Sequence, residues 1–97
     1  MIGGTRLSKT FKSFTEYIDY LSSKGFSFGI EEFGFIEFGK NYTGSTDQVV
    51  IIALELTLKI QREFDGAFFI SLLEKFKQEN IANKKQAKKH LEELNII

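Results

Sequence analysis

The chain has 97 residues, thirteen basic and thirteen acidic side chains, one histidine and no cysteine. This length fits one domain, and the balanced charge argues against a strongly basic nucleic-acid coat. The absence of cysteine excludes disulfides and thiolate metal sites and fits a reducing compartment, and a single histidine excludes a multi-histidine metal site within one chain. We therefore expect one cytoplasmic domain, spanning residues 1–97, with no metal and no cofactor.

Neither a secretion signal nor a membrane span is expected. The first five residues, Met1 to Thr5, lack an apolar signal region. The longest apolar run, Val49 to Leu54, is far shorter than the ~20 residues that cross a bilayer. Lysine outnumbers arginine eleven to two, a bias that is typical of AT-rich coding and is compatible with a phage or another mobile element as the source.

Residues 1–12 show no periodicity and are expected to be loosely ordered. A first helix is predicted after them, because Ser13 and Glu16 have the spacing of a capping box. Gly25 stands where a helix-terminating residue belongs, so the helix should end at Lys24. Its apolar side chains recur at helical spacing: Phe14, Tyr17, Ile18 and Leu21.

A β-hairpin is predicted next. Phe26, Phe28 and Ile30 alternate with small or polar residues, which is the pattern of a strand with one apolar face. Residues 35–38 would form the partner strand, with Ile36 and Phe38 facing inward. The turn would span residues 31–34, with Gly34 at a positive φ angle.

A central helix is predicted over about residues 46–64. Ser45 and Gln48 have capping-box spacing before it. Most of its circumference is apolar, and only Glu55, Lys59 and Arg62 form a polar stripe. Such a helix must be surrounded by other segments or by a second subunit.

Two more helices follow the break at Asp65-Gly66. The first is apolar from Phe68 to Phe76, and the last begins after Asn83 and has a narrow stripe that includes Leu94. The predicted fold class is therefore α+β: a helix, a two-stranded antiparallel hairpin, then three helices around the buried one. Because a lone hairpin is marginal, we also expect a homo-oligomer, by default a dimer.

The hairpin supplies the first candidate surface. Exposed aromatic side chains mark partner-binding surfaces, and the acidic neighbours favour a protein over a nucleic acid. Coverage by other helices or by a second subunit is the alternative. The predicted contact residues are Phe33, Phe35, Glu31, Glu32 and Glu37.

The lysine-rich last helix supplies the second candidate. Lys84, Lys85, Lys88 and Lys89 lie in its first turns, where the positive end of the helix dipole disfavours them. Phosphate binding would explain the placement. The alternatives are an ordinary solvated face, or a helix-turn-helix over residues 68–94 that lacks base-reading arginines.

The third candidate is an anion site before the central helix, where Lys40, Ser45 and Thr46 adjoin free helix amides. Capping loops of this composition are common, and no P-loop pattern is present.

Catalysis finds little support, since His90 has no evident nucleophile nearby and is expected to be solvated. We therefore expect a non-enzymatic regulator or inhibitor that binds a protein partner, with nucleic-acid binding through the last helix as the alternative.

Overall fold

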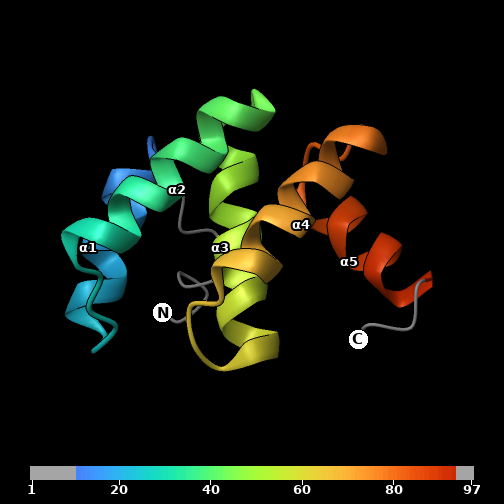
Figure 1. The fold of residues 1–97 in the computed structure, drawn as a ribbon. Coiled ribbons are helices and arrows are strands. Elements are labelled where there is room, and N and C mark those ends of the chain that lie inside the picture. The colour runs from blue at the N-terminus through green and yellow to red at the C-terminus, as the bar shows by residue number, and fades with distance from the viewer. Residues whose placement is uncertain (1–10, 94–97) are drawn as a thin grey trace.

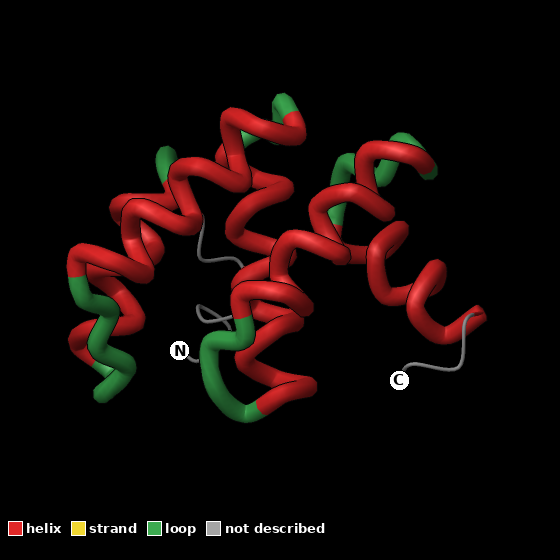
Figure 2. The backbone as a smooth tube through the Cα atoms, in the orientation of Figure 1, coloured by secondary structure: helices red, strands yellow, loops and turns green. Residues whose placement is uncertain are grey.

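The computed structural model describes residues 11–93. Within this range the chain forms five helices and no strand (Figure 2). The predictions for residues 1–10 and for Leu94 lie outside the described residues. The helices are α1 (Phe14–Ser23), α2 (Ile30–Thr43), α3 (Asp47–Gln61), α4 (Gly66–Gln78) and α5 (Lys84–Glu93).

The central element is α3, and α1, α2 and α4 all pack against it. In Figure 1, α4 crosses in front of α3, α2 lies beside α4, and α5 flanks α4 on the other side. α3 is covered by the other helices because most of its side chains are apolar. Seven of its fifteen residues are buried: Val50, Ile51, Ile52, Ala53, Leu54, Leu56 and Thr57.

The helix predicted over about residues 46–64 is thus present, but it is shorter. It ends at Gln61 because Arg62 adopts a left-handed backbone conformation, with φ at 67°. The predicted cap is also displaced by one residue. Thr46, rather than Ser45, accepts the hydrogen bond from the amide of Val49, at 3.2 Å.

The predicted α+β fold class is wrong, because the segment expected to form the hairpin is largely helical. Residues 26–29 are an irregular connection, and α2 runs from Ile30 through both the predicted turn and the predicted second strand. The alternation of Phe26, Phe28 and Ile30 covers only five residues. Apolar side chains at 33, 35, 36 and 38 fit a helix as well as a strand, so spacing alone could not decide.

Glycine was the misleading signal. Gly34 has no positive φ angle and lies inside α2. A Cβ atom at Gly39 would lie 2.7 Å from Cδ1 of Ile70, so this glycine allows α2 to pack closely against α4. The residue that ends α2 is Gly44, which is left-handed with φ at 67°. At the other end, Glu32 accepts a hydrogen bond from the amide of Gly29 at 2.9 Å.

The other predicted caps agree better with the structure. Ser13 accepts from the amide of Glu16 at 3.2 Å at the start of α1. Asn83 accepts from the amide of Gln86 at 2.9 Å at the start of α5. Between these ends, α4 buries Phe69 and Phe76 against the central helix layer.

Candidate functional site

α2 presents its most apolar side chains to solvent as well as to the core. Its inward line consists of Ile36, Gly39 and Thr43, all buried at helical spacing. On the opposite side, Ile30 is 92% exposed, Phe38 is 58% exposed and Tyr42 is 63% exposed.

The exposed residues form one row. Positions 30, 34, 38 and 42 are four residues apart, and such residues lie in one ridge along a helix surface. The rings of Phe38 and Tyr42 are stacked, with centroids 5.6 Å apart and planes 14° apart. We call Ile30, Gly34, Phe38 and Tyr42 the outer ridge. It is an apolar surface that nothing in residues 11–93 covers.

Phe33 and Phe35, which were predicted to contact a partner, occupy different surroundings. Phe33 is half-buried, and its ring lies 5.4 Å from that of Phe14 on α1. Phe35 is 37% exposed and lies 6.1 Å from the ring of Phe64, which follows α3. Phe35 therefore lies at the edge of the exposed surface, whereas Phe33 belongs to the contact between α1 and α2.

The three predicted acidic contact residues are all exposed, but they are not brought together at one point. Glu31 and Glu32 lie with Phe35 around a shallow hollow at the start of α2. Glu37 lies one to two turns later and lines a different depression. Acidic side chains therefore lie on both sides of the outer ridge.

That second depression is an open groove of about 400 Å³ between α1 and α2. Four of its lining residues come from α2, and they are spaced as i, i+3, i+4 and i+7: Ile30, Phe33, Gly34 and Glu37. From α1 and the connection come Thr15, Ile18, Asp19, Phe28 and Gly29. The floor is mainly apolar, and Asp19 and Glu37 give its rim negative charge.

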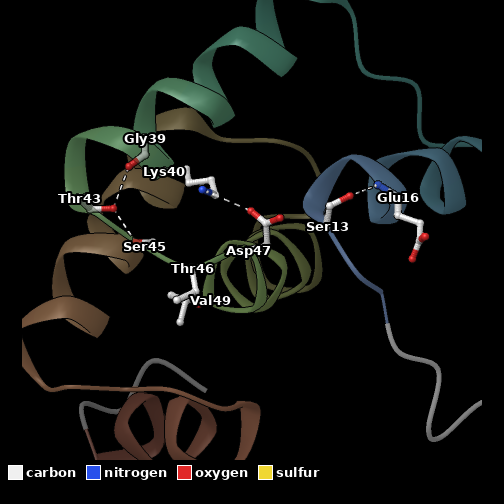
Figure 3. A network of polar contacts seen from close by, with 9 residues as sticks. All are labelled: Ser13, Glu16, Gly39, Lys40, Thr43, Ser45, Thr46, Asp47 and Val49. Atoms are coloured by element: carbon white, nitrogen blue, oxygen red, sulfur yellow. Dashed lines mark hydrogen bonds and ion pairs between the residues drawn. The ribbon is translucent and has the colours of Figure 1, made fainter.

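The junction between α2 and α3 brings together the three residues of the predicted anion site (Figure 3). Each of them is engaged within the chain. Lys40 Nζ lies 3.5 Å from Oδ1 of Asp47, the hydroxyl of Ser45 bonds that of Thr43 at 2.6 Å, and Thr46 caps α3. Since the carboxylate of Asp47 already occupies the first turn, the geometry does not favour a bound anion.

The four lysines of α5 are all exposed, yet they are not equivalent. Lys84 Nζ contacts Oε2 of Glu55 at 2.7 Å and ties α5 to α3. The other three have no acidic partner within residues 11–93: Lys85, Lys88 and Lys89. His90 is half-buried instead of solvated, and its Nε2 atom has no hydrogen-bond partner among the described residues.

Comparison with known proteins gives one result. A model of a family of unknown function, DUF6123, matches residues 9–97. The chain belongs to this family. Neither the curated proteins nor the solved structures contain a significant match. The function of this DUF6123 protein is therefore inferred from its own geometry.

The sequence prediction missed the exposed large apolar residues on α2 of this DUF6123 protein. Ile30 and Phe38 were predicted to lie on the inner face of the hairpin, and no role was predicted for Tyr42. Their four-residue spacing was the available signal, but it has meaning only once residues 30–43 are known to be helical.

Residues 11–93 contain no cluster of three or more histidine, cysteine, aspartate or glutamate side chains that could hold a metal ion. The same residues include no helix of the length and hydropathy needed to span a membrane.

Proposed function

We propose that this protein is a small helical interaction protein, a regulator or inhibitor that acts in the cytoplasm by binding a protein partner through the outer ridge of α2. The observation that carries the proposal is the exposure of Ile30, Phe38 and Tyr42 in one row. Large apolar side chains gathered on a surface and rimmed by polar groups mark protein-binding sites. Binding there would act by covering the partner's own functional surface.

The charge around the ridge supports a protein partner. Glu31, Glu32 and Glu37 lie on the same helix and would repel the phosphates of a nucleic acid. Aromatic residues at the centre with charged residues at the rim are the usual composition of a protein interface.

The test is capture of partners from the source cells with tagged full-length chain, read by quantitative mass spectrometry. Phe38→Ala and Tyr42→Ala should each reduce the recovered partner at least about tenfold, as expected when an aromatic anchor is removed. Both side chains are exposed, so the helical circular dichroism spectrum should not change.

Phe26→Ala is the matched control for this experiment. Phe26 is also an exposed aromatic residue, at 43%, but it lies in the connection before α2. Capture should survive this change. If the recovered partner falls equally in all three variants, or in none of them, the outer ridge is not the binding surface.

A second candidate function is nucleic-acid binding through α5. It is favoured by the exposure of Lys85, Lys88 and Lys89 without acidic partners in the described residues. Converting these three to glutamate should abolish binding to a DNA or RNA duplex, and wild-type affinity should fall steeply with salt. Lys84 is unsuitable for this test because it also holds α5 to Glu55. Salt-independent binding, or binding that survives charge reversal, would reject this candidate.

A further inference from the structure

The groove between α1 and α2 has a carboxylate on each of its two walls. Asp19 of α1 and Glu37 of α2 both line it, and both are exposed. Neither side chain makes an ion pair within residues 11–93. Because both lie beyond the first turn of their helices, the positive end of the helix dipole does not stabilise their charge either.

The two helices that form the groove carry almost no positive charge. α1 contains no lysine, arginine or histidine, and Lys40 is the one basic residue of α2. Lys40 lies 3.5 Å from Asp47 at the start of α3. Lys24, which follows α1, lies over the ring of Tyr20, 5.6 Å from its centroid. The negative charge of the groove is therefore not neutralised by these two helices.

The floor of the groove is apolar. Ile18, Phe28 and Phe33 are half-buried against the core, and part of each side chain lines the groove. Ile30 stands at one edge, where the groove meets the outer ridge. The groove is open and holds about 400 Å³, which leaves room for a large aliphatic or aromatic side chain.

An apolar floor between two acidic walls selects the charge of its occupant. A wholly apolar segment would remove water from the carboxylates and give them no partner. The same surface of a second copy would bring like charges together, and a nucleic acid would be repelled. A peptide that carries lysine or arginine on both sides of a large apolar residue is complementary to the floor and to both walls.

We propose that this groove binds a basic amphipathic helix of a protein partner, with a large apolar side chain on the floor and lysine or arginine side chains beside Asp19 and Glu37. An amphipathic helix that lays its apolar face in a groove is a common mode of recognition, and the aliphatic stems of basic residues cover its edges. The inference rests on the proposed function and names the chemistry of its partner, since Ile30 belongs to both the groove and the outer ridge.

The experiment titrates the full chain into a fluorescently labelled amphipathic peptide of leucine and arginine and measures anisotropy. Binding should be saturable and should weaken as salt rises, because the charged rim is exposed to solvent. Nuclear magnetic resonance of the labelled chain locates the peptide. The largest amide shifts should fall at Ile18, Phe28 and Phe33.

Two double variants separate the groove from general charge. Asp19→Asn with Glu37→Gln removes both wall charges and keeps the side-chain shapes, so the dissociation constant should rise at least about threefold at low salt. Glu74→Gln with Glu79→Gln is the matched control, because both residues are exposed, lie on α4 or at its end, and are outside the groove. The control should leave the dissociation constant unchanged, and circular dichroism should show that both variants are folded.

A second peptide, with glutamine in place of each arginine, should bind more weakly than the basic one. Equal affinity for both peptides, equal loss in both double variants, or no saturable binding overturns the proposal. Self-association of the chain that blocks the peptide would also overturn it and would make a second copy the occupant. If the peptide fails while partner capture still depends on Phe38 and Tyr42, the proposed function stands without the basic helix; if that dependence is also absent, both are rejected.

Discussion

Gly34 and Gly39 lie on the same helix, but the two glycines face different surroundings. The Cβ atom of an alanine at Gly39 would lie 2.7 Å from Ile70 and 3.2 Å from Leu73, whereas at Gly34 it would meet nothing. We expect Gly39→Ala to lower the free energy of unfolding by about 1–3 kcal/mol through overpacking.

The matched change, Gly34→Ala, should raise the free energy of unfolding by about 0.5–1 kcal/mol, because alanine favours helix and no contact is strained. Urea denaturation of both variants measures the two values. Equal effects would mean that α2 does not lie against α4 as described.

Thr46 and Ser45 are neighbours before α3 but have different hydrogen-bond partners. Thr46 caps α3, whereas the hydroxyl of Ser45 contacts Thr43. Thr46→Ala should lower the free energy of unfolding by about 1 kcal/mol, the usual effect of losing an N-cap. Ser45→Ala should have a smaller effect. Thermal unfolding of the two variants gives the comparison. The reverse order would support Ser45 as the cap.

At the scale of elements, α1, α3, α4 and α5 could be predicted because each has an apolar stripe and a local start signal. Ser13 and Asn83 show that such caps can be located from the sequence. α2 could not be predicted, since its apolar residues lie on two sides and its glycines resemble turn residues. What makes Gly39 a helical residue is its contact with α4, which is distant in sequence.

Among residues 11–93, α5 has few attachments to the other helices. It buries Ala87 and Leu91, and Lys84 pairs with Glu55. Helices of this length are marginal by themselves. Leu91→Ala should lower the free energy of unfolding by about 2–5 kcal/mol and increase hydrogen exchange across α5 before α3 exchanges. Glu92→Ala, which changes an exposed neighbour, is the control and should leave exchange unaltered.

For the whole molecule, the packing of α1 against α3 predicts a dependence on alkaline pH. Burial raises the pKa of the Tyr17 phenol above its ordinary value of 10.0, and the nearby charges of Glu55 and Tyr20 raise it further. The folded state therefore binds this proton more tightly than the unfolded state. The resulting stability is present below pH 10 and is lost as pH rises above it.

Tyr17→Phe removes this ionisation. We expect its free energy of unfolding to decline less than that of the wild type between pH 9 and 11, with little difference near pH 7. Urea titrations at each pH give the comparison. If the free energy of unfolding declines equally in both proteins over this pH range, another group controls the pH dependence.

The sequence by itself determined where most helices begin, that α3 must be buried, and that lysines gather on the last helix. These features follow from neighbouring residues, through capping groups and helical spacing. Only the tertiary structure decided that residues 30–43 are helical, that Phe33 packs on α1, that Lys84 pairs with Glu55, and that Phe38 is exposed. The physical reason is that each of these depends on a contact with a distant segment, and such contacts overrule an ambiguous local pattern.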